Sequence, residues 1–338
     1  MITRRQFLVG ATAGMAYAPL TSACAKNDNE PWDRAAYRKA PQSRVLIARA
    51  TDYTADLADI VAHAVRQFGL AVAGKRVMLK PNLVEFDPGG VINTHPALIG
   101  ATVDAFRRLG AQTVLVAEGP GHRRDNEYLL TASGLWDVLR ARDAEYVDLN
   151  LDDTRAVRTG SRFTRLGQLM LPQTVLNADL VVSMPKLKTH HFAGVTLALK
   201  NLFGVIPGAV YGWPKNVLHW AGVTESIVDI QATIPVPQFA IVDGIVGMEG
   251  NGPIHGQAKR AGVLLFGDDL VATDATAARL MNIEPSRVRY LAMADRFLGN
   301  TTLERITQIG ESLETVQQSF RLIETMRHLA ASERAGAS

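Results

Sequence analysis

The sequence predicts an α/β fold: one elaborated domain built on a largely parallel sheet with helices on both faces. Two observations lead to this prediction. Apolar runs of strand length alternate along the chain with segments of helical period, and such alternation implies crossover connections between parallel strands. The 338 residues are 47% hydrophobic and 20% charged, an ordinary globular composition that can bury a large core.

The first 25 residues predict a twin-arginine export signal. Arg4 and Arg5 precede an uncharged apolar run rich in glycine and alanine, and small residues suited to cleavage follow it. The run is shorter than the ~20 residues that a membrane span needs. We therefore expect the twin-arginine export machinery as a partner and the periplasm as the location.

Cys24 is the only cysteine of the chain, which excludes disulfides within it and iron–sulfur clusters held by cysteines. Its position suggests lipoprotein processing, although Thr21 stands where such a site usually has leucine. Cleavage after Ala25 would instead discard the cysteine. Both outcomes stay open: a protein that meets the membrane only through a lipid anchor at Cys24, or a soluble periplasmic product.

The polar residues 26–43 contain two prolines and predict a tether to a domain that spans residues 44–300. The expected order in the first half is strand 44–50, helix 56–69, strand 75–82, helix 96–110, strand 112–119, helix 127–141 and strand 145–150. After a hairpin inserted at 152–172, we expect strand 178–185, helix 216–233, strands 237–244 and 261–269, and helices 269–281 and 285–296.

Residues 301–330 carry an apolar stripe of helical spacing. Its members are Ile306, Ile309, Leu313, Val316, Phe320 and Ile323. The stripe predicts a C-terminal amphipathic helix, which either packs on its own domain or forms a dimer.

Polar side chains gather where the predicted strands end, and ligands of open parallel sheets bind beyond the carboxyl ends of strands. Lys80 and Asn82 follow one strand and Glu118 another, while a later strand runs into Lys186, Lys188 and His190. The strand at 237–244 leads to Asp243 and Glu249. Topology would bring these ends to one rim.

Lysine is unusually placed in this chain. Between Arg165 and Arg260 there is no arginine, yet the segment contains Lys186, Lys188, Lys200, Lys215 and Lys259. Lysine is a compact point charge whose pKa falls on burial. Lys200 lies in an apolar context and needs a counter-charge or an anionic ligand. The pattern predicts an anion-binding site, and a net charge of only +3 argues against nucleic acid as a partner.

We assign catalysis to Lys186, Lys188, His190 and Lys200. Lys186 and Lys188, two apart, point the same way in an extended strand and form either an anion clamp or a solvated edge. Lys80 either binds the ligand or extends to solvent at the sheet rim. The aromatic residues near Lys215 predict a pocket wall or simple packing.

The acidic residues and the glycine-rich segment each have two possible roles. Asp243 and Glu249 are the candidate ligands of a divalent metal ion or the counter-ions of the lysines. Gly250 and Gly252 predict a loop whose backbone approaches the ligand, or a tight turn alone. For Asp268 and Asp269, which precede a helix, capping is the favoured role.

Five motifs in a fixed order carry a resemblance to a known family. They are KPNLV, INTHPALIGATVDAFRRLGAQTVLVAEGPG, ADLVVSMPKLKTHHFAGVTLALKNLFGV, DGIVGMEGNGP and GVLLFGDDLVATDATAARLM. Together they closely resemble the domain of unknown function 362 family, from about Arg44 to residue 296. The resemblance adds His95, Asn201 and Asp274 to the motif residues. Many members carry a ferredoxin-like cysteine segment, which this chain lacks.

The leading hypothesis is an exported enzyme that acts on an anionic small molecule, with Lys80, Asn82, His95, Glu118 and Asn201 as further ligand-binding residues and a divalent metal as an optional cofactor. Two alternatives remain: a periplasmic binding or accessory protein without turnover, and a redox partner that uses a separately supplied cofactor.

Overall fold

The structure, a computed structural model, describes residues 30–121 and 125–331. The expected export signal and the processing of Cys24 lie outside these residues and stay predictions. Residues from Pro31 onward form one compact unit. No helix in the described part of the chain has both the length and the apolar character needed to cross a membrane.

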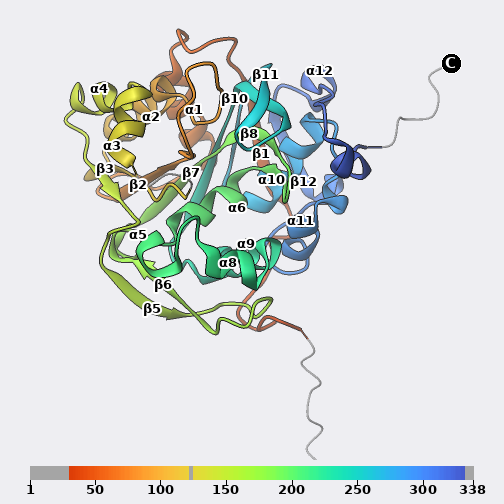
Figure 1. Cartoon of the computed structure of the whole chain (residues 1–338). Coiled ribbons are helices and arrows are strands. Elements are labelled where there is room, and N and C mark those ends of the chain that lie inside the picture. The colour runs from red at the N-terminus through yellow and green to blue at the C-terminus, as the bar shows by residue number, and fades with distance from the viewer. Residues whose placement is uncertain (1–29, 122–124, 332–338) are drawn as a thin grey trace, which may run out of the picture. The chain divides into compact units, whose positions relative to one another are not determined.

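A ten-stranded sheet forms the centre of the molecule (Figure 1). Its strands are β1 (Ser43–Arg49), β2 (Arg76–Pro81), β3 (Thr113–Glu118), β4 (Tyr146–Asp148), β7 (Leu180–Met184), β8 (Lys186–His190), β9 (Gly194–Thr196), β10 (Gln238–Asn251), β11 (His255–Gly267) and β12 (Ile306–Gly310). Their order is β12-β1-β11-β10-β7-β2-β3-β4, with β8 paired to β10 and β9 to β8. Within this sheet only the described pairings of β11 and β9 are antiparallel, so the predicted largely parallel α/β sheet is confirmed.

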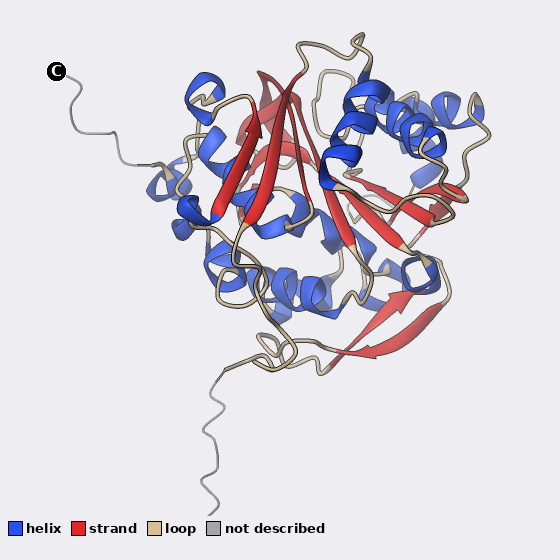
Figure 2. Ribbon diagram, turned by 180° about the vertical axis from the view of Figure 1, so that it is seen from behind, coloured by secondary structure: helices blue, strands red, loops and turns tan. Residues whose placement is uncertain are grey.

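Helices cover both faces of this sheet (Figure 2). One face carries α1 (Leu57–Phe68), α2 (Pro96–Arg108), α3 (Asn126–Ala132) and α4 (Leu135–Arg140). The other carries α5 (Gln173–Asn177), α6 (Ala198–Asn201), η1 (Leu202–Val205), α7 (Gly208–Tyr211), α8 (Asn216–Ala221), α9 (Val223–Thr233), α10 (Leu270–Leu280), η2 (Pro285–Arg287) and α11 (Arg289–Ala294). Side chains of successive strand residues point to opposite faces of the sheet, so Val181 and Val182 of β7 pack in different cores. Because both faces are covered, the strands are continuous apolar runs in the sequence.

Capping residues set the starts of three helices. Asp56, His95 and Asp269 each accept a hydrogen bond from a backbone N–H in the first turn of α1, α2 and α10. Such caps satisfy donors that have no partner within the helix. The capping role predicted for Asp269 is thereby confirmed, whereas Asp268 is exposed, 3.8 Å from Arg44.

The irregular region before β7 forms the hairpin that the sequence predicts. Strands β5 (Thr154–Arg158) and β6 (Gln168–Pro172) pair antiparallel in a separate two-stranded sheet, with Thr154 opposite Pro172. Figure 1 shows this hairpin reaching below the main body.

The predicted tether is wrong for residues 31–43. Trp32 is buried and its ring stacks on that of Phe297 at a centroid distance of 4.6 Å. The hydroxyl of Tyr37 donates to the carbonyl of Ala232 at 2.7 Å. Two aromatic side chains thus dock an otherwise polar segment, because each buries far more apolar area than its neighbours.

The predicted C-terminal helix is also wrong, and with it the domain boundary at residue 300. Residues 301–330 form η3 (Leu303–Arg305), strand β12, α12 (Leu313–Val316) and η4 (Glu324–Leu329). Strand β12 pairs parallel with β1, with Ile306 opposite Ser43. The apolar stripe is divided among these elements: Ile306 is buried in β12, whereas Val316 and Phe320 pack on the core. The domain therefore extends to about residue 330.

Strands β2 and β7 are parallel neighbours, but the strands that follow each of them are added to opposite sides of the sheet. From β2 the chain proceeds to β3 and β4 on one side, and from β7 it proceeds to β10 on the other. The first connection runs through α2 and the second through α6 to α9, on opposite faces. Ligands of open α/β sheets bind in the crevice that such a switch creates at the carboxyl ends of the strands.

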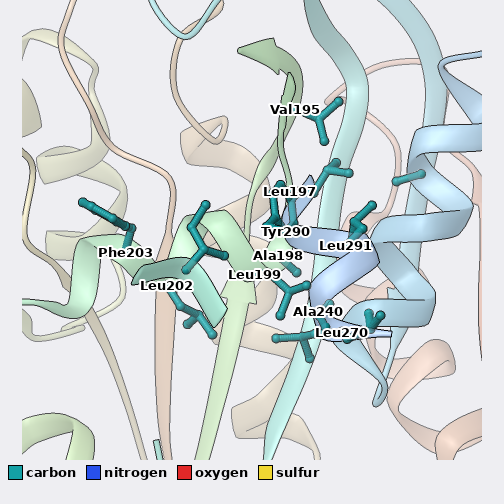
Figure 3. Close-up of a cluster of buried hydrophobic side chains, with 14 of the residues drawn as sticks. Val195, Leu197, Ala198, Leu199, Leu202, Phe203, Ala240, Leu270, Tyr290 and Leu291 are labelled. Atoms are coloured by element: carbon teal, nitrogen blue, oxygen red, sulfur yellow. The ribbon is translucent and has the colours of Figure 1, made fainter. Parts of the chain in front are cut away.

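A dense apolar cluster fixes the segment on one side of this crevice (Figure 3). The labelled side chains come from residues 195–203, β10, α10 and α11, and include Leu199, Leu202 and Leu291. All three are buried. The cluster anchors the short helix α6, which carries Lys200 and Asn201.

Candidate functional site

A pocket of about 380 Å³ lies at the carboxyl ends of the strands beside the switch point. Its lining comes from six segments: 82–84 after β2, 118–121 at the end of β3, 188–196 in β8 and β9, 200–204 in α6 and η1, 214–219 before and in α8, and 251–255 at the β10–β11 turn. The pocket therefore brings together three of the predicted strand ends, those that carry Asn82, Glu118 and Lys188, but not Asp243 or Glu249.

Three lysines, Lys188, Lys200 and Lys215, line this pocket, and Glu118 is the one carboxylate among its described lining residues. Lys188 and Lys215 are 0% and 1% exposed, and Lys200 is partly buried. None of the three forms an ion pair with another described residue. Three ammonium groups thus converge on a cavity that contains too little negative charge to neutralise them.

Backbone carbonyls hold two of these ammonium groups. Lys188 Nζ donates to the carbonyls of Ile92 at 2.7 Å and Pro253 at 3.3 Å. Lys215 Nζ donates to the carbonyls of Gly119 at 2.6 Å and Gly204 at 3.1 Å. Carbonyl dipoles orient an ammonium without cancelling its charge, so both groups remain able to attract an anion.

Lys215 also has an uncommon backbone conformation. Its φ of 70° and ψ of 50° place it in the left-handed region, where residues other than glycine are rare. Such conformations persist only where the surroundings enforce them, and they concentrate at functional sites.

The third ammonium, that of Lys200, makes no hydrogen bond with any other described residue. Its Nζ lies 4.8 Å from the centre of the Phe203 ring, a cation–π contact. The carboxamide of the buried Asn82 likewise has no described hydrogen-bond partner, and its Oδ1 is shielded from solvent. A buried polar group without a partner is costly in a folded protein, and both groups face a cavity in which water or a ligand could bind them.

Burial lowers the pKa of each pocket lysine. The pKa of Lys200 falls to about 8, mainly through burial and then through the charge of Lys80. Burial lowers the pKa of Lys215 to about 7, against an opposing effect of Glu118. The pKa of Lys188 lies well below its usual value through burial and the nearby Lys200. Lys200 and Lys215, with pKa values of about 8 and about 7, therefore exchange protons near neutral pH.

The pair of Lys80 and Glu118 forms the wall behind the pocket. Both side chains are buried and are joined by a short ion pair, and Glu118 also accepts hydrogen bonds from the N–H groups of Leu83 and Gly119. Lys80 Nζ further donates to the carbonyl of Pro81 at 2.8 Å. Its charge is therefore compensated within the protein, unlike the charges of the three pocket lysines.

Asn201 and Asp274 position the helix that carries Lys200. Asn201 Nδ2 donates to the carbonyl of Lys80 at 2.9 Å and to Ser183 Oγ at 3.1 Å. Asp274 accepts hydrogen bonds from the N–H groups of Ala198 and Leu199 at the start of α6. Asp274 therefore acts on the ligand site through other groups, whereas Asn201 also lines the pocket itself.

Four of the eight histidines line the pocket: His190, His191, His219 and His255. His190 is buried, and its Nδ1 accepts hydrogen bonds from the N–H groups of Phe192 and Ala193. Burial, followed by the charge of Lys200, depresses its pKa well below the usual value. His190 is therefore neutral, with its proton on Nε2.

Lys186, Asp243 and His95 lie outside the pocket in a separate buried network. Lys186 Nζ is 2.6 Å from Asp243 Oδ2, and the Tyr53 hydroxyl donates to Asp243 Oδ1 at 2.8 Å. The backbone N–H of His95 also reaches Asp243, and the His95 ring stacks on Tyr53. Because every charge in this network is paired, it resembles a structural ion network rather than a reactive site.

The two candidate metal ligands are not brought together. Glu249 lies six residues beyond Asp243 on the extended strand β10, about 20 Å along it, and is 3.6 Å from Arg321 and 3.9 Å from Lys259. Across the described residues, no three His, Cys, Asp or Glu side chains gather in a group suited to a metal ion.

Gly250 and Gly252 shape the β10–β11 turn and are not among the pocket lining residues. Gly250 has a φ of 85°, and a Cβ on Gly252 would come within 2.0 Å of the carbonyl oxygen of Thr189. Of the two roles predicted for these glycines, a tight turn therefore fits the structure.

Of the residues predicted for the site, Asn82, Glu118, Lys188, His190, Lys200 and Asn201 line the pocket and Lys80 lies directly behind it. Sequence reasoning did not assign Lys215, although it noted a possible wall beside this residue. The signal that could have identified Lys215 is its place among the lysines of the arginine-free segment. His219 and His255 had no such signal.

One curated relative is the thylakoid-associated protein sll1697 of Synechocystis sp.. It is 28% identical over 265 residues, which cover 75% of this chain and 78% of that protein.

Two solved structures show weaker similarity. The lactate racemase apoprotein from Thermoanaerobacterium thermosaccharolyticum aligns with a TM-score of 0.46 and 14% identity, over 72% of this chain and 58% of that one. A Thermotoga maritima protein aligns with a TM-score of 0.39 and 12% identity, over 69% of this chain and 60% of that one. The chain thus spans less than two thirds of either structure's length.

The sequence model of the family described as "Domain of unknown function (DUF362)" matches residues 77–279. This range covers well over half of the chain and includes Lys80, Asn82, Glu118 and the three pocket lysines. The match agrees with the order of motifs seen in the sequence, and the protein belongs to the DUF362 family.

Proposed function

We propose that the protein is an enzyme that binds an anionic small molecule, a carboxylate or a phosphate, in the pocket of Lys188, Lys200 and Lys215. The observation that carries the proposal is the convergence of three ammonium groups without carboxylate partners on one cavity. A buried charge without compensation costs several kcal/mol, and an anionic ligand offsets that cost. Asn82 also lines the pocket, and its Nδ2 can supply a further donor to the anion.

The three lysines differ in the roles that their contacts support. Lys188 is held by two backbone carbonyls, so its Nζ is a hydrogen-bond donor in a fixed position. The pKa is about 7 for Lys215 and about 8 for Lys200. At neutral pH each side chain is therefore present in both its protonated and its neutral form. Either can therefore take a proton from the bound anion or return one, with the neutral His190 as a further donor through Nε2.

Binding can be measured before any substrate is known. We expect inorganic phosphate to bind the wild type in isothermal titration calorimetry, and the Lys188→Met, Lys200→Met double variant to lose at least tenfold in affinity. Lys75→Met is the matched control, since it removes a positive charge from an exposed lysine outside the pocket. Equal phosphate binding by the wild type and the double variant would contradict the proposed site.

Turnover requires a separate experiment. The wild type and Lys215→Met are each incubated with a mixture of carboxylated and phosphorylated metabolites, which is then followed by mass spectrometry. We expect at least one anion to be consumed by the wild type alone. Lysine-dependent phosphate binding without consumption of any anion would instead identify a non-catalytic binding protein.

A further inference from the structure

The pocket is much larger than the anionic group that its lysines can neutralise. Its volume is about 380 Å³, whereas a carboxylate or phosphate group fills roughly the space of two water molecules, ~60 Å³. The volume lies in the range of sites that enclose an organic molecule, which are mostly apolar with a few placed polar groups. The greater part of this cavity must therefore receive something other than the anion.

Apolar side chains line that remaining part. Leu83 and Val84 follow β2, Pro253 and Ile254 come from the β10–β11 turn, and Phe192 comes from the β8–β9 turn. These residues belong to three segments that meet only in the folded chain. Their carbon surface favours the burial of apolar ligand atoms.

Two of the lysines and Phe192 lie at different depths, while Leu83, which is 3% exposed, lies as deep as those lysines. Lys188 and Lys215 are 0% and 1% exposed, and so belong to the floor of the pocket. Phe192 is 66% exposed and therefore stands at its mouth, with its ring 4.3 Å from that of His191. An exposed aromatic ring beside a cavity is available to pack against a ligand.

We propose that the ligand is an amphipathic anion, whose carboxylate or phosphate lies on the lysine floor and whose apolar body lies against Phe192, Leu83 and Ile254. This inference rests on the proposed function, because the lysine floor sets the orientation of the ligand. It adds the chemical class: an aromatic or aliphatic acid, or a phosphate ester of such a group, rather than a small inorganic or highly hydrated anion.

Two matched pairs of probes test the inference: acetate with benzoate, and inorganic phosphate with phenyl phosphate. Within each pair the charged group is the same, and only the ring is added. We expect each aromatic member to bind the wild type at least tenfold more tightly in isothermal titration calorimetry, because burial of the ring adds apolar contact.

Variants separate the two parts of the pocket. Phe192→Ala should lower the affinity for benzoate and phenyl phosphate by about threefold to tenfold while leaving acetate and phosphate unchanged. Lys200→Met should weaken all four probes. Leu303→Ala, which removes a 48% exposed side chain outside the pocket lining, should change none of them.

The possible results distinguish this inference from the function on which it rests. If phosphate and acetate bind through the lysines but the aromatic probes gain less than threefold, the inference is overturned and the anion site stands. An aromatic gain that is equal in the wild type and Phe192→Ala would likewise overturn the proposed placement of the apolar body. If none of the four probes binds in a lysine-dependent way, the proposed function falls as well.

Discussion

Buried lysines in this protein occur in two electrostatic situations. Lys80 and Lys186 are each neutralised by one carboxylate, from Glu118 and Asp243 respectively. Lys188, Lys200 and Lys215 have no such partner among the described residues. The first kind of lysine maintains the fold, whereas the second is stable only because its ammonium can lose its proton or meet an anion.

Anion affinity should therefore depend on pH through these lysines. Sulfate keeps its charge from pH 6 to pH 9, whereas Lys215 and Lys200 lose their protons around pH 7 and pH 8. Below pH 7 both are charged, so sulfate affinity should be highest there and fall at least tenfold by pH 9. Calorimetric titration at each pH measures this.

A control variant identifies the source of this pH dependence. Lys200→Met should show a shallower fall in sulfate affinity, since one of the two titrating groups is gone. A sulfate affinity that stays constant from pH 6 to pH 9 in the wild type would contradict the assignment of both lysines to the site.

At the scale of single elements, helix α6 and the following turn η1 join the pocket to the core. Asp274 accepts hydrogen bonds from the first N–H groups of α6, and the apolar cluster of Figure 3 includes the α6 residues Ala198 and Leu199. At the other end, Gly204 lies directly against the ion pair of Lys80 and Glu118. A short, otherwise marginal helix is thus positioned by contacts at both of its ends.

Gly204→Ala should disturb that contact. The added Cβ would lie 2.1 Å from Glu118 Oε1 and 2.7 Å from Lys80 Nζ, so the buried pair must separate or the turn must move. We expect the free energy of unfolding to fall by about 2–4 kcal/mol in urea titrations. Gly89→Ala is the control, because a Cβ there meets nothing within 4 Å and the backbone needs no positive φ; equal stability of the two variants would refute the close packing.

Periodicity predicted most of these elements because local pattern and tertiary environment agree in a doubly covered sheet. The C-terminal segment shows where this fails: Ile306 and Val316 have helical spacing, yet one belongs to an edge strand and the other packs on the core. The position of Lys188 after a predicted strand and the apolar surroundings of Lys200 in the sequence likewise identified these two residues. These signals could not separate them from Lys186, whose partner Asp243 is 57 residues away in the chain.

At the scale of the whole molecule, the two ends of the described domain meet in the sheet. Strand β1 lies between β11 and β12, so the first strand is held by segments from the last third of the chain. The C-terminal residues also contribute Phe320 and Leu329 to the main core. They are therefore an integral part of the domain rather than an appended helix.

A chain that ends at residue 300 should fail to fold stably. It lacks β12, which leaves β1 as an unpaired edge, and it exposes the core beneath Phe320. We expect aggregation, or a Tm lower by more than about 10 °C, in thermal unfolding followed by circular dichroism. A chain that ends at residue 331 keeps every described element and is the control; a stable, soluble product ending at 300 would restore the appended-helix description.

The position of β1 has a consequence during protein synthesis. Its partners Phe266 and Ile306 are more than 200 residues further along the chain, so a ribosome must release most of the polypeptide before β1 can pair. Translation at about 5–20 residues per second leaves this apolar strand without its neighbours for on the order of ten seconds or more. Final closure of the sheet around β1 can therefore occur only after translation is nearly complete.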